Sequence, residues 1–262
     1  MKASICIEMI YTESPFLDRI LLAAEQGFDA VEFWNWDNKD MKGIKAAAAA
    51  AGIAVAVFQS NRGGTMINPA HRDSFLAGIR ESLTMANEMG ATRLFLLTDE
   101  LGEDRGVRFK FPEIPWETQR QSVLGCLKEL APLAEKAGVT LVLEPLNTYV
   151  DHAGYFLNHS SMGLELVRAV GSPNIRLLYD VYHMQIMEGN LIPTLTGNLD
   201  AIGHVHIADT PGRHEPGTGE INYAVLLRKL READYQGYVG CEFAPTIPST
   251  DAAAQALALI RG

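Results

Sequence analysis

The chain has 262 residues, of which 47% are hydrophobic and 21% charged, a composition that is ordinary for a globular α/β protein. Its formal net charge of −10 argues against a nucleic-acid groove, which needs a basic face, and against attraction to anionic membranes. Three widely separated cysteines fit a reducing cytosol, and we find neither a signal-peptide pattern nor an apolar run of about 20 residues, so we expect a cytoplasmic protein without membrane spans.

Strand-like and helix-like segments alternate through the first half of the chain. The first helix is expected to begin at Ser14, because serine is a common N-cap and Pro15 suits the first turn, and to end at Gly27. The predicted strands of this half cover residues 3–8, 30–34, 53–58 and 93–97. The predicted helices that follow them cover residues 14–27, 41–51, 69–89 and 116–136.

The second half repeats this alternation four more times. Its predicted strands cover residues 141–144, 175–180, 202–207 and 238–242. Its predicted helices cover residues 161–170, 182–199, 222–233 and 252–260, and the second of them is expected to break near Gly189 and Pro193.

Eight strands that alternate strictly with eight helical segments predict a parallel sheet with right-handed crossovers. About 250 residues is the usual size of a (β/α)8 barrel, so we expect one TIM-barrel domain over residues 1–262. An open doubly wound sheet is the alternative, but it would leave edge strands. The motifs GxGxxG and GxxxxGK[ST] are both absent, so no nucleotide site is indicated.

Four successive strands of the second half each carry one metal-type side chain at or near the carboxyl end. These residues are Glu144, Asp180, His206 and Glu242, and we call them the strand-end cluster. In a barrel, such strand ends meet at one mouth, where active sites lie. Three carboxylates brought together without a cation would repel one another, so we expect one divalent ion of the Mn²⁺, Mg²⁺ or Co²⁺ type.

Each of these residues also has an ordinary structural interpretation. A glutamate that ends a strand, such as Glu144, is commonly a solvated rim residue or a partner of a helix cap. His204 lies two residues before His206 on the same face of its strand, and it suits a hydrogen-bonded core histidine. His183 could bond a backbone carbonyl, and Arg213 could be a solvated loop residue. The coincidence of four ligand types at four adjacent strand ends is what favours a functional site.

Four segments of the second half are similar to the xylose-isomerase-like barrel superfamily, and within it most similar to the hydroxypyruvate isomerase family. The resemblance is strong over residues 139–243 and weak over the first half. The segments that carry it are Glu144–Asn147, Tyr179–Gly189, His204–Ile207 and Gly212–Asn222.

The resemblance implies a metal held by the strand-end cluster, with Glu144 and Glu242 as the acid–base pair. It also implies that His183 and Arg213 contact substrate oxygens. Two positions depart from the family pattern. Hydroxypyruvate isomerases often carry glutamine where His206 stands, whereas the ketose 3-epimerase branch carries histidine; that branch also has a glutamate where this chain has Val150.

The resulting expectation is a metal-dependent isomerase that interconverts hydroxypyruvate and tartronate semialdehyde, or acts on a closely related short sugar acid, through an enediolate. Arg213 offers a fork suited to the substrate carboxylate. A ketose 3-epimerase of the tagatose or psicose type is the alternative. An apurinic-endonuclease-like metallonuclease would need a basic surface, and a binding module without catalysis would not need the pair of glutamates. The expected partner is a small sugar or sugar acid, with no nucleic acid and no membrane, and a homo-oligomer is left open.

Overall fold

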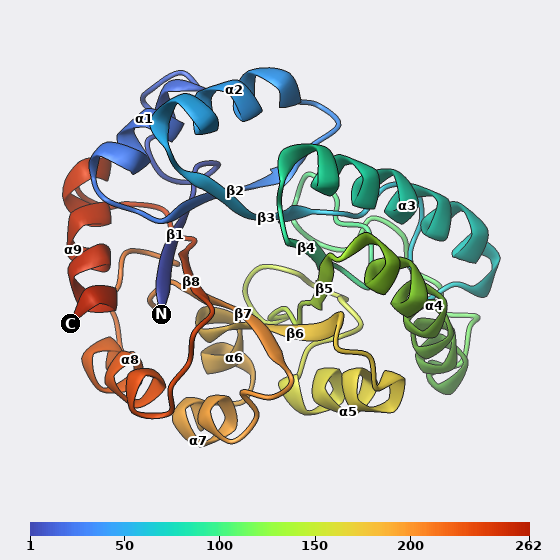
Figure 1. The fold of residues 1–262 in the computed structure, drawn as a ribbon. Coiled ribbons are helices and arrows are strands. Elements are labelled where there is room, and N and C mark those ends of the chain that lie inside the picture. The colour runs from blue at the N-terminus through green and yellow to red at the C-terminus, as the bar shows by residue number, and fades with distance from the viewer.

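The computed structural model describes residues 1–262 and contains eight parallel strands that close into a barrel (Figure 1). Each strand pairs with the next one along the chain, and β8 pairs with β1 to complete the ring. The expected (β/α)8 barrel is therefore confirmed. The strands are β1 Lys2–Cys6, β2 Ala30–Asn35, β3 Ala54–Gln59, β4 Arg93–Leu96, β5 Thr140–Leu143, β6 Ile175–Asp180, β7 Ile202–Ile207 and β8 Tyr238–Cys241.

Helices surround the strands on the outside of the barrel (Figure 1). They cover the outer face of the sheet, so the strands are buried on both sides and read as nearly continuous apolar runs. The helices are α1 Asp18–Glu25, α2 Met41–Ala51, the short 3₁₀ helix η1 Pro69–His71, α3 Arg72–Met89, α4 Trp116–Ala137, α5 Ser160–Val170, α6 Val181–Met187, α7 Leu191–Thr196, α8 Tyr223–Glu232 and α9 Ser249–Arg261.

The expected N-cap at Ser14 is wrong. Helix α1 begins at Asp18, and its N-cap residue is Leu17, which makes no side-chain capping bond. Ser14 instead closes a turn, because its N–H donates to the carbonyl of Tyr11 at 2.9 Å and Tyr11 has a φ of 61°. The sequence signal Ser-Pro is shared by turns and helix starts, and here the turn prevails.

The segment between β6 and β7 contains two short helices instead of one broken helix. Gly189 and Asn190 separate α6 from α7, and both adopt left-handed backbone conformations, with φ of 62° and 49°. Pro193 lies in the first turn of α7, where its missing N–H would have no helical partner in any case. The break predicted at Gly189 is therefore correct, whereas Pro193 does not interrupt a helix.

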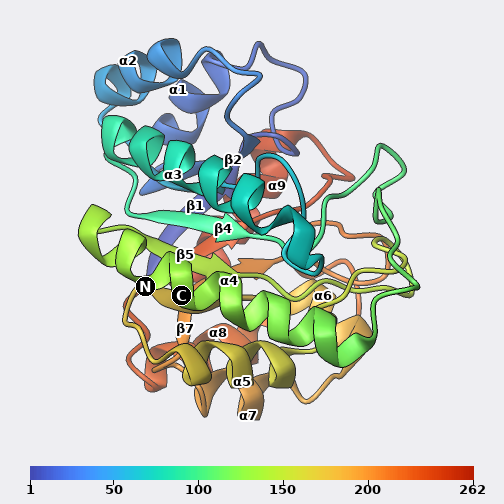
Figure 2. The ribbon, with the colours of Figure 1, turned by 90° about the vertical axis from the view of Figure 1, so that its right-hand side faces the viewer.

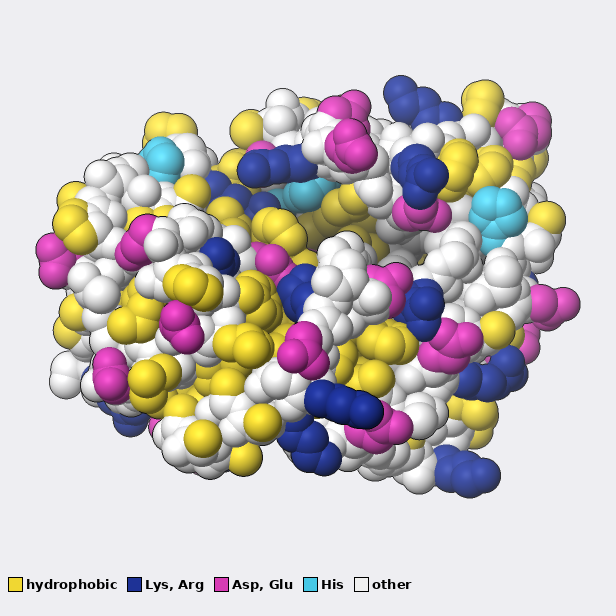
Figure 3. All heavy atoms as spheres, turned by 90° about the horizontal axis from the view of Figure 1, so that it is seen from above, with side chains coloured by type: hydrophobic (Ala, Val, Ile, Leu, Met, Phe, Trp, Pro, Cys, Tyr) yellow, Lys and Arg dark blue, Asp and Glu magenta, His cyan; other side chains and the backbone are white.

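The surface carries charges of both signs, and no helix is both long enough and apolar enough to cross a membrane. On the face seen in Figure 3, Lys and Arg side chains are interspersed with Asp and Glu side chains. A continuous basic stripe of the kind that follows a nucleic-acid backbone is not visible there.

Two long loops close over the carboxyl ends of β4 and β5. The β4–α4 loop, residues 97–115, projects at the right-hand side of the barrel in Figure 2. Asp99 joins it to the β5–α5 loop, residues 144–159: its Oδ2 accepts hydrogen bonds from the Thr98 hydroxyl at 2.7 Å and from the Phe156 N–H at 3.0 Å. Asp99 is 2% exposed, so this connection is made by a buried carboxyl group.

This carboxyl group is expected to make stability depend on pH. Burial raises the pKa of Asp99 from 3.8 to about 6, and the two hydrogen bonds offset only part of that rise. A raised folded-state pKa means that the folded protein holds a proton that the unfolded chain has released, so stability falls as pH rises from about 4 to about 6. Asp99→Asn removes this dependence. Its melting temperature relative to the wild type should therefore rise between pH 4.5 and pH 8, by the equivalent of about 1–3 kcal/mol.

Thermal melts of both proteins at the two pH values measure this effect. Asp73→Asn, which removes an exposed carboxylate from α3, controls for the change in net charge. A difference in melting temperature between the wild type and Asp99→Asn that is the same at both pH values would contradict the assignment.

Candidate active site

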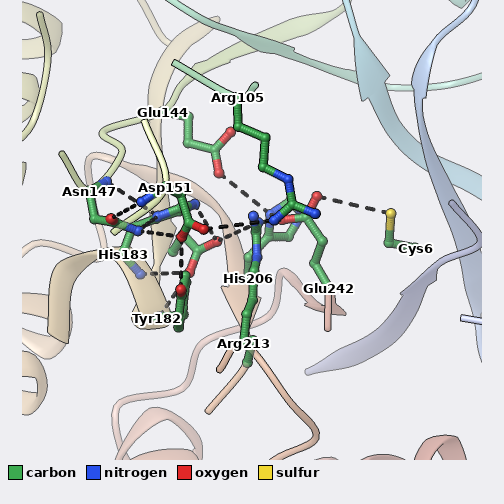
Figure 4. Close-up of polar contacts among 12 residues, drawn as sticks. Cys6, Arg105, Glu144, Asn147, Asp151, Tyr182, His183, His206, Arg213 and Glu242 are labelled. Atoms are coloured by element: carbon green, nitrogen blue, oxygen red, sulfur yellow. Dashed lines mark hydrogen bonds and ion pairs between the residues drawn. The ribbon is translucent and has the colours of Figure 1, made fainter. Parts of the chain in front are cut away.

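The strand-end cluster converges at one end of the barrel. Glu144 directly follows β5, Asp180 is the last residue of β6, His206 lies in β7 and Glu242 directly follows β8. One ligand atom from each residue lies within 4.8 Å of those of the other three, and all four side chains are buried. Figure 4 shows Glu144, His206 and Glu242 approaching one another from different strands. The expected convergence is therefore present, since parallel neighbouring strands bring their carboxyl ends together.

The imidazole of His206 bridges the cluster and a carboxylate that the sequence analysis missed. Its Nε2 lies 2.8 Å from Glu32 Oε2. Its Nδ1 lies 3.3 Å from Glu242 Oε2 and 3.7 Å from Glu144 Oε1. Burial lowers the pKa of His206, but Glu242 and Glu32 raise it more, and the net result lies well above its usual value. The field of the carboxylates thus favours a positive charge at the centre of the cluster.

Glu32 lies on β2 inside the barrel and is 2% exposed. It accepts hydrogen bonds from His206 and from the hydroxyl of Ser4, and its Oε1 lies 2.9 Å from His204 Nε2. His204 is therefore a buried partner of Glu32 and lies outside the strand-end cluster. Glu32 could have been found in the sequence, because a carboxylate within the apolar run 30–34 is the same signal as Glu144 in its own strand.

The two glutamates of the expected acid–base pair lie in different electrostatic environments. Burial raises the pKa of Glu144 to about 7, although its contact with His206 acts in the opposite direction. Burial also acts to raise the pKa of Glu242. The opposing effect of Arg213 and His206 is larger, so the net pKa is about 2. Trp34 adds a hydrogen bond from its indole nitrogen to Glu242 Oε1 at 2.7 Å.

His183 presents an N–H group beside the cluster. Its Nδ1 accepts a hydrogen bond from the backbone N–H of Asn147 at 3.2 Å, so the hydrogen of the neutral ring is on Nε2. That Nε2 is buried, has no hydrogen-bond partner and lies 3.6 Å from Asp180 Oδ2. The alternative in which His183 bonds a backbone carbonyl is therefore not observed, and its free donor faces the cluster.

Arg213 is a buried residue, not a solvated loop arginine. It is 9% exposed, and its backbone is held in the left-handed region with a φ of 57°. One terminal nitrogen lies 2.6 Å from Glu242 Oε2 and 3.8 Å from Asp180 Oδ2. Its guanidinium also lies over the ring of Tyr182, 5.4 Å from the ring centroid. Its Nε is buried without a hydrogen-bond partner, and only one of its terminal nitrogens donates to the protein.

A cavity of about 570 Å³ opens above these residues. This volume lies within the range of pockets that enclose small-molecule ligands. Its walls come from both halves of the chain and include Trp34, Glu144, His152, His183, Arg213 and Glu242.

The sequence analysis did not identify His152, which is preceded by no apolar run and so gives no strand-end signal. Val150 is 67% exposed and does not line the cavity.

Three comparisons place the chain among known proteins. The family model described as xylose isomerase-like TIM barrel matches residues 20–262. The 2-oxo-tetronate isomerase of Cupriavidus necator is 33% identical over 246 residues, which cover 91% of this chain and 91% of that protein. The hydroxypyruvate isomerase of Escherichia coli is 31% identical over 252 residues, 94% of each chain. The solved structure of AP endonuclease, family 2, from Brucella melitensis has a TM-score of 0.87 at 28% identity, covering 97% of this chain and 98% of that one.

These matches extend over the first half of the chain, where the sequence motifs were weak. They also agree with the closed barrel. The resemblance found in the second half is therefore confirmed for the chain as a whole, and the protein belongs to the xylose isomerase-like TIM barrel family.

Proposed function

We propose that the protein is a divalent-metal-dependent isomerase that moves a carbonyl group between adjacent carbons of a short sugar acid, such as hydroxypyruvate, through an enediolate. The observation that carries this proposal is the buried cluster of Glu144, Asp180, His206 and Glu242, of which Glu144 and Glu242 also line the cavity. The names of the two curated relatives support an isomerase of this substrate class. The free, buried state of all three cysteines supports a cytoplasmic location.

The strand-end cluster has the chemistry of a site for one divalent ion. Three buried carboxylates and an imidazole whose Nδ1 has no hydrogen-bond partner form an oxygen-rich donor set that suits Mn²⁺, Mg²⁺ or Co²⁺. Glu32 holds the other ring nitrogen of His206, as carboxylates commonly do for metal-ligating histidines. When bound, the ion would supply Lewis-acid stabilisation of the oxygen charge that develops during the reaction.

The proton transfer is assigned to Glu144 and Glu242. One carboxylate removes the proton from the carbon that bears the hydroxyl group, and the electron pair of that C–H bond forms the enediolate. Either the same glutamate or the opposite one delivers a proton to the neighbouring carbon. The hydroxyl proton moves to the former carbonyl oxygen, so the product is an isomer and no oxidant is needed.

Two residues position the substrate. His183 donates its Nε2 hydrogen to a substrate oxygen beside Asp180. It can do so because the hydrogen bond from Asn147 keeps the hydrogen of the ring on Nε2. Arg213 binds the substrate carboxylate through a guanidinium that is already oriented by Glu242 and Tyr182. Because both residues are buried, their orientation does not have to be established when the substrate arrives.

A ketose 3-epimerase would use the same pair of glutamates on a neutral sugar, and His206 is the residue that favours this alternative. A nuclease is not proposed, because the net charge is −10 and the face in Figure 3 has no basic stripe.

The proposed isomerase function is tested by measuring solvent-deuterium incorporation and product formation with hydroxypyruvate, 2-oxo-tetronate, tagatose and psicose. The assays use metal-free protein with added Mn²⁺ or Mg²⁺. Turnover of the acids supports the isomerase, and epimerisation of the sugars alone would replace it by the epimerase.

Replacing either glutamate by glutamine should abolish turnover while the fold survives. Glu144→Gln and Glu242→Gln keep the shape of the side chain but remove the proton acceptor, and we expect a loss of kcat of ~10²–10⁴-fold or more. Steady-state assays, with thermal melts as a check on folding, measure this. The exposed Glu232→Gln on α8 is the matched control. A rate above about a tenth of wild type in either variant would remove that residue from the proton transfer.

Glu32→Gln should weaken metal binding without removing a ligand. The glutamine amide is neutral, and with its NH₂ group in the place of Oε2 it no longer accepts from His206 Nε2, so the tautomer of His206 is no longer fixed. We expect the affinity for Mn²⁺ to fall by ~10–100-fold in calorimetric titrations. Unchanged affinity, with a melting temperature near that of the wild type, would show that Glu32 serves only the packing of the barrel.

A further inference from the structure

His152 is a buried side chain on the cavity wall that the proposed mechanism does not use. It lies in the β5–α5 loop, is 6% exposed and lines the cavity. Its ring centroid lies 5.2 Å from that of His183. The two imidazoles therefore form adjacent parts of one wall, with His183 beside the strand-end cluster.

The tautomer of His152 is fixed by the backbone. Its Nδ1 lies 2.9 Å from the carbonyl oxygen of Arg105, and a carbonyl oxygen can only accept, so Nδ1 carries the hydrogen. Burial lowers the pKa of His152, which keeps the ring neutral. Its Nε2 therefore has a free lone pair. This atom makes no hydrogen bond to the protein and is not among the buried atoms that lack a partner, so it remains accessible on the cavity side.

The β4–α4 loop is arranged to make this contact. Arg105 adopts a left-handed backbone with a φ of 65°, which is uncommon for a residue with a side chain. The Gly102 N–H donates to the Gly106 carbonyl at 2.8 Å, and the Val107 N–H donates to the carbonyl of Ala153 at 3.2 Å. The second bond connects the β4–α4 loop to Ala153, the residue that follows His152. Together the two bonds keep the carbonyl of Arg105 next to the His152 ring. Figure 4 shows the side chain of Arg105 extending toward the site.

The two histidines offer opposite hydrogen-bonding groups. His183 presents an N–H, which can donate to a carbonyl, carboxylate or hydroxyl oxygen. His152 presents an unprotonated nitrogen, which accepts a hydrogen bond from a hydroxyl group but faces the oxygens of a carboxylate unfavourably. The wall next to the strand-end cluster therefore matches a substrate that carries a hydroxyl group close to its reacting carbons.

We propose that His152 Nε2 accepts a hydrogen bond from a hydroxyl group on the substrate carbon adjacent to the reacting pair. The preferred substrate would then be a hydroxylated sugar acid or ketose of four or more carbons. This inference rests on the proposed isomerase function and narrows its substrate class. Hydroxypyruvate does not meet the requirement, because its only carbon outside the reacting pair is the carboxylate. The cavity of about 570 Å³ is also much larger than a three-carbon acid.

Two substitutions at this position separate substrate contact from structural support. In His152→Asn the amide nitrogen stands near the place of Nδ1, so the bond to the Arg105 carbonyl is kept and the acceptor facing the cavity is lost. In His152→Gln the amide group extends toward the place of Nε2, so an acceptor is kept and the bond to Arg105 is lost. Each variant is assayed with 2-oxo-tetronate and with its 4-deoxy analogue, 2-oxo-3-hydroxybutanoate, which lacks only the terminal hydroxyl.

The wild type should prefer 2-oxo-tetronate over the deoxy analogue in kcat/KM by about tenfold or more. His152→Asn should lose this preference, mainly through a higher KM for 2-oxo-tetronate, and His152→Gln should retain much of it. Thermal melts should rank the two variants in the opposite order, with the asparagine variant the more stable.

Three outcomes would overturn the inference. If the wild type turns over both compounds equally well, no hydroxyl group is recognised. If the glutamine variant loses the preference and the asparagine variant keeps it, the role of His152 is to support Arg105. In both cases the isomerase function stands. If no compound in the panel exchanges a proton with solvent, the proposed function fails and this inference fails with it.

Discussion

The structure depends on how negative charge is compensated inside the barrel. Glu32, Glu144, Asp180 and Glu242 are all nearly inaccessible, and an unpaired buried carboxylate costs several kcal/mol. His206 lies between Glu32 on one side and Glu144 and Glu242 on the other. Its position explains why the pKa of this histidine is raised, although burial alone would lower it. Carboxylates that converge in this way are also the groups that bind a divalent cation.

The loops at the mouth of the barrel supply further residues that change the pKa values and hydrogen bonding of the site. Arg213 is brought to Glu242 by a left-handed backbone, and it helps to push the pKa of that glutamate down while burial pushes the pKa of Glu144 up. Pairs of acids whose environments separate their pKa values are typical of acid–base sites. Backbone groups determine which nitrogen carries the hydrogen in His183 and His152. The hydrogen-bonding groups that these two histidines present are therefore set by their contacts with main-chain atoms.

The barrel and the strand-end cluster could be predicted because both follow from local patterns. Eight apolar runs with helices between them allow few other folds, and a carboxylate at the end of a buried strand has no structural use. Glu32 was overlooked because it lies within a strand, although the cost of its burial is the same. His152 could not be predicted, since its position depends on contact with Arg105 from a different loop. The start of α1 was placed too early because a serine followed by proline suits both a turn and a helix.

Glu32 has a consequence for how the two halves of the barrel depend on each other. All four residues of the strand-end cluster come from β5 to β8 and the loops that follow them, whereas Glu32 belongs to β2. Gly240 in β8 leaves space for its carboxylate, since a Cβ there would lie 2.6 Å from Glu32 Oε1 and one of the two would have to shift. A fragment made of the second half alone would contain every proposed ligand but not the carboxylate that orients the imidazole. In evolutionary terms, residues 32 and 240 should therefore change together or remain as they are.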